Sequence, residues 1–269
     1  MLLLLACQPP PPSPGEPCNG SVAACDRPLP DVVFPGAHNA MSNEAEGWLA
    51  PNQLVPPAAQ LDAGVRAMLV DTYTWRGDTW LCHTLCEAGA TPLTDFLTAL
   101  AEFLDAHPRE VVLLIVQDAA PHAAALTALE QAGLVEHLLG PPWPTLGEAI
   151  AADTRLVWTV ESEDPDAPPW ATPFYGVGWD TPYTFRRPED FTCDPFRGDA
   201  SHELFLINHW ISNPLPDRSA AAQVNTAAAL HERVAACEAR HGRLPTVLAV
   251  DFATVGDAVV VARELNERP

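Results

Sequence analysis

The sequence predicts an α/β protein built as a (β/α) barrel. Short apolar runs alternate with stretches of helical periodicity through most of the 269 residues, a pattern typical of parallel sheets covered by helices. One run, Glu110 to Gln117, is β-branched and apolar on both faces, as in a strand buried on both sides. A doubly wound sheet is the rival architecture. The chain has no dinucleotide fingerprint, P-loop or nucleophile-elbow motif that would support it or an α/β-hydrolase.

The apolar runs predict strands and the stretches between them predict helices. The expected strands are 31–37, 65–72, 110–117, 154–161, 174–179, 204–209 and 246–252. The expected helices lie near 92–107, 121–139, 145–152, 219–241 and 256–266. The first of these helices is delimited most clearly, because Pro92 suits a first turn and His107 precedes a proline.

Composition restricts the partners of this protein. The 48% apolar content is enough for a large core, and the net charge of −21 comes with only 14 basic residues. Nucleic-acid binding requires a basic face and is therefore not expected. Long-range attraction to an anionic membrane is not expected either. We expect a monomer.

The first residues resemble a lipoprotein signal. Leu4-Leu5-Ala6-Cys7 is similar to a bacterial lipobox, whose cysteine is lipidated, and Pro9 to Pro12 would form an extended tether. The segment lacks the basic start and the longer apolar run of a full signal peptide, so it is either truncated or a chance match. We expect 1–17 to be signal and tether and 18–269 to be one barrel domain, exported to the bacterial cell envelope or beyond.

Six further cysteines suit an oxidising compartment, where an even number allows complete pairing. Local spacing favours Cys18–Cys25 and Cys82–Cys86, which leaves Cys193–Cys237, although fifteen pairings are possible. A zinc site at Cys82 and Cys86 is the alternative, but no second ligand pair stands nearby at a suitable spacing.

Two histidines each end an apolar run. His38 follows Val32 to Ala37, and His83 follows Trp80-Leu81-Cys82. The carboxyl ends of barrel strands surround the mouth where active sites are built. Two imidazoles at such a place suggest a general base and a general acid acting across one bond, whereas a lone histidine is usually structural.

Five segments in order resemble the phosphatidylinositol-specific phospholipase C X-domain family, most closely its secreted branch. They are Gly36-Ala37-His38-Asn39-Ala40-Met41-Ser42, Gly64 to Tyr73, Leu81-Cys82-His83, Phe103 to Val112 and Leu248 to Phe252. Their spacing agrees over 25–266. The resemblance implies the distorted, incompletely closed TIM-like barrel of the PLC-like phosphodiesterases.

The resemblance also implies a mechanism. His38 would deprotonate the inositol 2-hydroxyl that attacks phosphorus, and His83 would protonate the leaving diacylglycerol oxygen. Asp251 would hold the base histidine and stabilise its imidazolium, unless it only caps a helix or forms a structural pair. Arg66 would stabilise the phosphate charge or would form a structural salt bridge.

Calcium-dependent relatives imply a metal site that this sequence keeps only in part. Asn39 and Asp71 match the ligand pattern, Leu69 replaces one glutamate, and Gln117 replaces another with Asp118 beside it. Asn39, Asp71 and Asp118 could hold Ca²⁺ with water and phosphate completing the shell. Metal-independent bacterial relatives have arginine where this chain has Asp71.

In the alternative interpretation, Asp71 only orients His83 or accepts a hydrogen bond from Arg66. Polar and aromatic residues at predicted strand ends are candidates for contacting the inositol ring or lipid: Tyr73, Asn208 and Trp210, with Trp75 and Tyr183 as further aromatics. Single aromatics more often pack in the core.

These observations predict a secreted or lipid-anchored phosphodiesterase that cleaves phosphatidylinositol, or a related diester, through a cyclic inositol phosphate. Few basic residues stand at strand ends, so an unphosphorylated headgroup is favoured. One rival is a glycerophosphodiester or sphingomyelin-type phosphodiesterase on the same barrel. The other is a non-catalytic lipoprotein that binds lipid headgroups or glycans.

Overall fold

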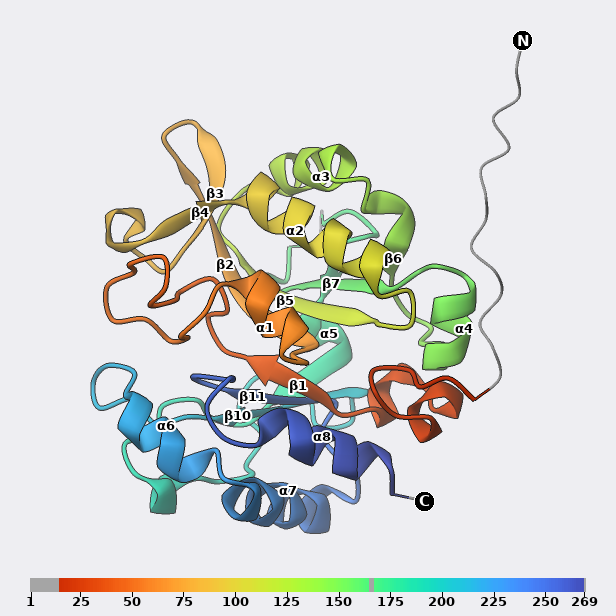
Figure 1. Cartoon of the computed structure of the whole chain (residues 1–269), viewed down its shortest axis with the longest axis vertical. Coiled ribbons are helices and arrows are strands. Elements are labelled where there is room, and N and C mark those ends of the chain that lie inside the picture. Colours follow the sequence, from red (N-terminus) through yellow and green to blue (C-terminus); the bar gives the residue numbers. More distant parts are fainter. Residues whose placement is uncertain (1–14, 165–166, 269) are drawn as a thin grey trace.

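A computed structural model describes residues 15–164 and 167–268. Its centre is a curled 11-stranded sheet with strand order β6-β7-β5-β2-β1-β11-β10-β9 along the main path (Figure 1). The strands are β1 Phe34–Ala37, β2 Ala67–Trp75, β3 Asp78–Cys82, β4 Ala90–Pro92, β5 Val112–Asp118, β6 Leu138–Leu139, β7 Leu156–Val160, β8 Thr172–Pro173, β9 Gly178–Asp180, β10 Leu204–His209 and β11 Val247–Val250.

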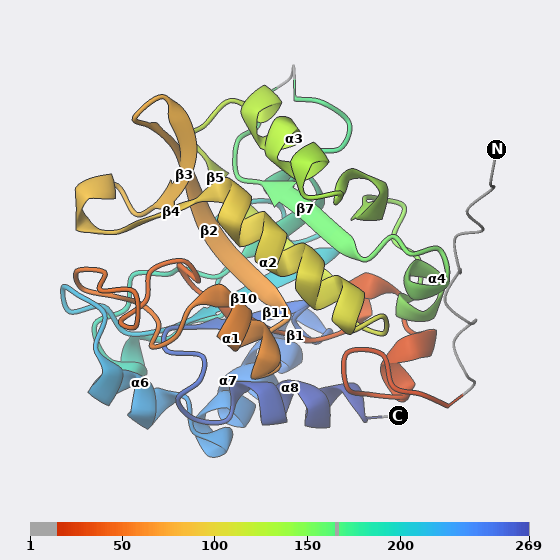
Figure 2. The same cartoon turned by 45° about the horizontal axis from the view of Figure 1, so that its top comes forward.

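Most helices cover the outside of this sheet (Figure 2), whereas the two that begin at Leu146 and Phe174 pack on its interior cluster. The helices are α1 Pro57–Asp62, α2 Leu93–Ala106, α3 His122–Gln131, α4 Leu146–Ala151, α5 Phe174–Val177, α6 Arg218–Val224, α7 Ala227–His241 and α8 Ala258–Asn266. Short 3₁₀ turns occur at Ala23–Asp26, Leu29–Asp31, Cys86–Ala88, Val135–His137 and Pro188–Asp190.

The barrel is incompletely closed, as the family resemblance implied. Every pair along the main path is parallel, from β6 on β7 to β10 on β9. Within the described residues, neither β6 nor β8 pairs with β9, so the sheet stays open there. The fold is therefore a distorted (β/α) barrel rather than a doubly wound open sheet with a switch point.

Alternation along the strands separates the two faces of the sheet. In β2, Ala67 and Leu69 point into the barrel interior, whereas Met68 and Val70 pack under the outer helices. In β5, Leu113 belongs to the same interior cluster. Because side chains alternate with a period of two, the interior face of each strand is set by these buried positions. The same alternation decides which residues at the strand ends face the barrel interior.

Three sequence predictions of secondary structure were wrong in detail. The expected strand 174–179 begins as α5, because a helical turn places Phe174 and Tyr175 in the barrel interior beside the open seam. The expected helix 219–241 is two helices, since Asn225 ends α6 and its side chain donates to the backbone of Asp251. The stretch expected as one helix over 121–139 is helical only over α3, which ends at Gln131, and its last two residues form β6.

A β-hairpin and one helix were not predicted at all. Strand β2 extends past the carboxyl end of its neighbour β5, and β3 runs back antiparallel to this extension and pairs with β4 (Figure 1). Helix α1 follows the long loop after β1. Their short, mixed-polarity sequences have neither helical nor strand periodicity over enough residues to predict them.

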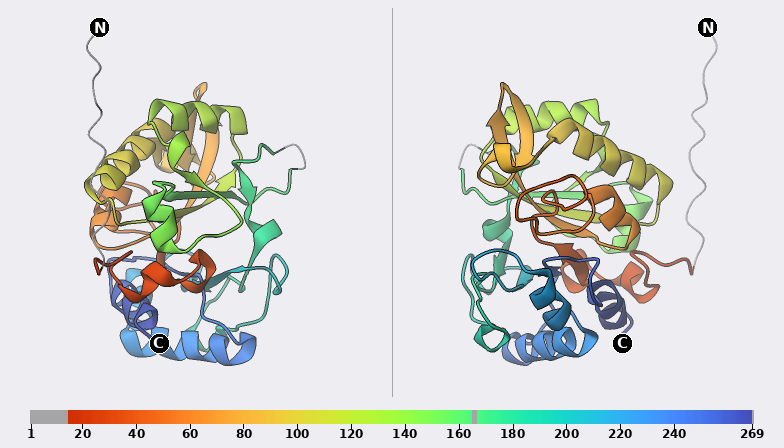
Figure 3. Two further views of the ribbon diagram at one scale, coloured as in Figure 1. Left: turned by 90° about the vertical axis from the view of Figure 1, so that its right-hand side faces the viewer. Right: turned by 60° about the vertical axis from the view of Figure 1, so that its left-hand side comes forward.

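The first described residues pack beneath the amino ends of the strands (Figure 3). The side-chain amide of Asn19 donates to the carbonyl of Val111, just before β5, and accepts from its N–H. Asn266 makes the same two hydrogen bonds with the backbone of Val33, just before β1. The disulfides Cys18–Cys25, Cys82–Cys86 and Cys193–Cys237 are all present. They confirm the predicted pairing and exclude zinc at Cys82 and Cys86.

Cys7 and the lipobox lie outside the described residues. Among the residues that the structure describes, no helix is long and apolar enough to span a membrane.

Candidate active site

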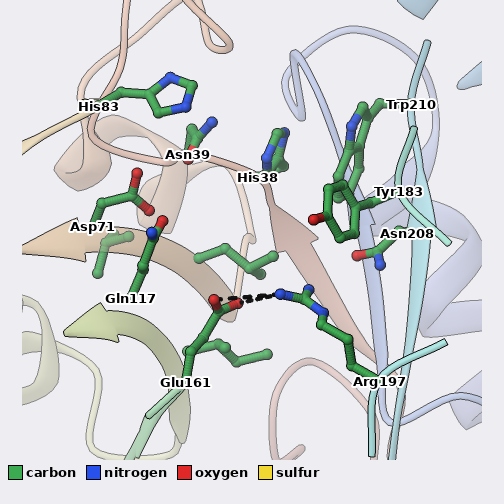
Figure 4. A pocket seen from close by; sticks show the side chains of 13 residues that line it. His38, Asn39, Asp71, His83, Gln117, Glu161, Tyr183, Arg197, Asn208 and Trp210 are labelled. Atoms are coloured by element: carbon green, nitrogen blue, oxygen red, sulfur yellow. Dashed lines mark hydrogen bonds and ion pairs between the residues drawn. The ribbon is translucent and has the colours of Figure 1, made fainter. Parts of the chain in front are cut away.

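A cavity of about 260 Å³ opens at the carboxyl ends of the parallel strands. Its lining side chains come from the carboxyl ends of several strands (Figure 4), and Asp71, Gln117 and Asn208 each stand two residues beyond an interior core residue of the same strand. The lining residues are His38, Asn39, Leu69, Val70, Asp71, His83, Ile115, Gln117, Glu161, Tyr183, Arg197, Asn208 and Trp210.

His38 is held in one orientation by a buried carboxylate. Its Nδ1 lies 2.8 Å from Oδ1 of Asp251, which is almost fully buried at the end of β11. The Asn52 amide donates to the same oxygen at 3.0 Å. A carboxylate at Nδ1 fixes the proton there and leaves Nε2 as the basic nitrogen. The structure thus brings together the predicted base and its predicted partner.

The backbone around His38 is fixed as well. Its amide donates to the carbonyl of Val250, which extends the β1–β11 ladder, and its carbonyl accepts from Nε2 of Gln53 at 2.7 Å. The ring of Trp210 stacks on the imidazole, with centroids 3.8 Å apart and planes 5° from parallel. Trp210 therefore supports His38, and the face of the indole that covers the imidazole is not free for the predicted stacking on a sugar ring.

His83 enters the cavity from a different direction. It follows β3 rather than a parallel strand, and its side chain lies across Asn39 from His38 (Figure 4). Partial burial lowers the pKa of His83, the nearby charge of His38 lowers it further, and Asp251 opposes both. The two imidazoles are thus electrostatically coupled within one cavity. A bound anion between them would favour the protonated form of His83.

Asp71 is a buried carboxylate without a hydrogen-bond partner among the described residues. Burial raises its pKa to about 7, and the charge of His38 moderates this rise. Asn39 and Gln117 lie beside it in the cavity (Figure 4). Asn39 has a left-handed backbone, with φ of 45°, its Nδ2 donates to Asn52, and its Oδ1 accepts from no group among the described residues. One carboxylate and two amides therefore form an oxygen-rich corner.

The predicted metal ligand Asp118 lies on the outward face of the sheet. Asp118 follows the interior residue Gln117 by one position, so it points outward, where it accepts from the backbone and hydroxyl of Ser162 and pairs with His122. It is not a metal ligand of this cavity. Gln117 takes the interior place instead.

Arg66 precedes β2, at the amino end of the barrel. Its Nε pairs with Glu110 at 2.7 Å, its Nη1 donates to the carbonyls of Leu61 and Val65, and its guanidinium covers the ring of Phe103. The structural salt bridge is therefore correct, and the predicted contact with phosphate is wrong.

Two of the predicted substrate-contact residues differ in position. Tyr73 lies on the overhanging part of β2, packs against the outer core and does not line the cavity. Asn208 does line it. Its Nδ2 donates to Asp180 and to the carbonyl of Thr181, and its Oδ1 has no partner in the described part of the chain.

Sequence reasoning missed an ionic cluster on the opposite wall. Arg197 pairs with the fully buried Asp180 at 2.6 Å and with Glu161 at 3.3 Å. Its guanidinium lies between the rings of Tyr175 and Tyr183. Glu161 could have been found by counting interior positions along β7, whereas Arg197 belongs to a long irregular loop that offers no periodic signal.

Comparison with known proteins places this chain in a family. The model of the PI-PLC X domain matches residues 24–266. A PI-PLC X domain-containing protein 1 of Arthroderma benhamiae is 29% identical over 93% of this chain and 89% of its own length. An uncharacterized secreted protein of the same fungus is 26% identical over 96% of this chain and 65% of its own length.

A PI-PLC X domain-containing protein of Arabidopsis thaliana is 30% identical over 80% of this chain and 56% of its own length. In fold, the chain is similar to structures of phosphatidylinositol-specific phospholipase C from Staphylococcus aureus. One gives a TM-score of 0.65 at 13% identity and covers 93% of this chain and 98% of that one. The sequence match over nearly the whole barrel, with the matching fold, shows that the chain belongs to the PI-PLC X domain family.

Proposed function

We propose that this protein is a phosphodiesterase of the phospholipase C type, which cleaves phosphatidylinositol or a related diester by acid–base catalysis. One observation carries the proposal. Two histidines from separate strands face one cavity, and only the first is backed by a buried carboxylate. That asymmetry suits one base and one acid, because the carboxylate stabilises the imidazolium that the base forms.

The proposed reaction has two proton transfers. Nε2 of His38 takes the proton of the attacking inositol hydroxyl, whose oxygen forms a bond to phosphorus. The bond from phosphorus to the leaving glycerol oxygen breaks, and His83 donates a proton to that oxygen. The products are a cyclic inositol phosphodiester and an alcohol. Asp251 stays ionised and lowers the energy of protonated His38.

A calcium ion is a proposed partner of the oxygen-rich corner. Asn39, Asp71 and Gln117 would supply one carboxylate and two amide oxygens, a donor set that suits a hard cation. When bound, Ca²⁺ would neutralise charge developing on phosphate. With a single carboxylate, the site should be weaker than one with three or four. The unpartnered, buried Asp71 supports this proposal, because such a group gains most from a cation.

The charge of the lining favours an unphosphorylated headgroup. Arg197 is the single arginine or lysine that lines the described cavity, and Asp180 and Glu161 already neutralise it. A second phosphate on the inositol ring would therefore meet Glu161 without a free cation. Hydroxyl groups instead suit the acceptor oxygens of Glu161 and Asn208.

Exposed apolar side chains on the loops around the mouth favour a lipid substrate. Leu49 follows β1, Leu85 follows His83, Phe196 follows β9 and Leu215 follows β10, and each is more than half exposed. Leu49 and Leu85 lie on adjoining loops, since the Leu49 amide donates to the carbonyl of Ala88. Burying such residues in a bilayer gains hydrophobic free energy without requiring anionic lipid.

The test is ³¹P NMR of phosphatidylinositol vesicles incubated with the protein, with Ca²⁺ in one arm and a chelator in the other. We expect a cyclic phosphodiester resonance that His38→Ala reduces by about 10²–10⁴-fold in rate. Loss of the signal in chelator would support the calcium site. Absence of product in both arms would refute phosphatidylinositol cleavage. Parallel choline and glycerol diesters would then separate another phosphodiesterase from a non-catalytic binding protein.

We further propose export and anchoring of the chain through a lipid on Cys7. Three disulfides and a relative named as secreted support export. Labelling with a radioactive fatty acid tests the anchor. Label should appear in the wild-type protein and be absent from Cys7→Ser, and label in both would refute the assignment.

A further inference from the structure

The proposed general acid lies inside the smallest covalent ring of the described chain. Cys82 is the last residue of β3, His83 follows it, and the Cys82–Cys86 disulfide closes the loop with a sequence separation of 4. Both cysteines are buried, and Cys82 lies opposite Ala90 of β4 in the ladder. The ring is thus fixed to the sheet at Cys82 and to the core at Cys86.

His83 has no other fixed support. In the described part of the chain no hydrogen bond reaches its imidazole, whereas that of His38 is held by a carboxylate and a stacked indole. The carbonyl of His83 accepts from the amide of Leu85 at 2.7 Å within the same ring. The backbone of the loop therefore sets where the acid lies.

That backbone adopts a conformation that an open loop would abandon. Thr84 has φ of 63°, in the left-handed region that β-branched residues rarely occupy. An acyclic segment would relax from it, and the tip of the loop is exposed, so few packing contacts resist this movement. Besides the covalent closure, the described structure constrains this loop by the backbone hydrogen bonds from Leu85 to His83 and from Ala88 to Leu85.

We propose that the Cys82–Cys86 disulfide is the positioning element of the general acid, and that its loss impairs leaving-group protonation while sparing the base step. This inference rests on the proposed function. His38, Asp251 and Trp210 follow other strands, and no hydrogen bond or ring stacking joins them to 82–86 in the described part of the chain, so nucleophile activation should survive. Displacement of an acid by about 1 Å can cost about 10²-fold in rate.

The test compares two soluble inositol phosphodiesters on the double variant Cys82→Ala/Cys86→Ala. One has an alkyl leaving group, which needs a proton as it departs, and the other has a nitrophenyl leaving group, which does not. We expect kcat/KM to fall about 10²-fold or more on the alkyl ester and less than about 5-fold on the nitrophenyl ester. His83→Ala should show the same selectivity.

Cys18→Ala/Cys25→Ala is the matched control, because it opens another short ring on the opposite face. It should change both rates equally or not at all. Retained activity on the nitrophenyl ester shows in the same experiment that the variant has folded. Amide exchange at Leu85 should also accelerate in the Cys82/Cys86 variant, since its hydrogen bond lies within the ring.

Equal losses on both esters, or no loss on either, would overturn the positioning role of the disulfide. Inactivity of the wild-type protein on both esters would instead overturn the proposed function and this inference with it.

Discussion

Replacing Asp251 by Asn should reveal how much of the proposed catalysis depends on one buried charge. The substitution keeps the shape of the side chain and removes the carboxylate 2.8 Å from Nδ1 of His38. The resting enzyme loses little by this change, because neutral His38 needs only a hydrogen-bond acceptor. The transition state loses much more, because His38 is then an imidazolium.

The magnitude follows from the geometry. Unit charges about 4 Å apart interact by about 4 kcal/mol at the effective dielectric constant of about 20 that suits such sites. Asp251 is 2% exposed, so water screens the pair weakly. The Asn side chain retains part of the hydrogen bonding, and we therefore expect a loss of about 2.7–4 kcal/mol, or about 10²–10³-fold in kcat/KM.

The assay is initial-rate kinetics on the alkyl and nitrophenyl inositol phosphodiesters. Both substrates require the base, so Asp251→Asn should slow both by the same factor, in contrast to the loss of the acid. Asp217→Asn is the matched control, because Asp217 caps α6 and Asn caps equally well. A loss below about 10-fold, or one confined to the alkyl ester, would refute the role assigned to Asp251.

Three further predictions concern other parts of the molecule. Arg66→Met should leave catalysis unchanged but lower the free energy of unfolding in urea by about 3 kcal/mol, because Glu110 loses its partner; lost activity at unchanged stability would contradict this. Leu49→Ser with Leu215→Ser should cut activity on vesicles about 10-fold and spare soluble substrates, whereas equal losses would argue against a lipid-facing mouth. Burial lowers the pKa of His209 to about 4. Because a histidine in the unfolded chain has a pKa of about 6.5, the unfolded state binds more protons below that pH. The free energy of unfolding should therefore fall by up to about 3 kcal/mol as the pH drops towards 4. His209→Gln should flatten this dependence in pH-resolved urea titrations, and an unchanged slope would contradict it.

Much of the barrel could be predicted because its parallel strands are buried on both faces. The runs containing β1, β2, β5, β7, β10 and β11 are apolar at consecutive positions, which few other structures require. The hairpin β3–β4 could not be predicted in this way. Its two strands are short and mix buried, half-buried and exposed positions, so they show no clear period.

Tyr73 was misplaced because it lies on the part of β2 that extends beyond the cavity and pairs with β3. Two other errors in the candidate site share one physical cause. A period of two separates Gln117, which faces the cavity, from Asp118, which faces the helices, and it places Arg66 with the outward residues of β2. Counting from the apolar core would have corrected both. No count could have found Arg197, because its place depends on the path of an irregular loop and on the buried carboxylate of Asp180.

The attachment of the first described residues has a consequence for membrane orientation. Gly15 leads into a segment beneath the amino ends of the strands, whereas the cavity opens at their carboxyl ends. Cys7 lies eight residues earlier, and such a span reaches at most about 28 Å. The 9 residues of β2, with the part that pairs with β3 beyond the cavity, extend about 30 Å from the amino end to the hairpin beside the mouth. A lipid on Cys7 would therefore direct the mouth away from its own leaflet, towards substrate on a facing surface or in solution.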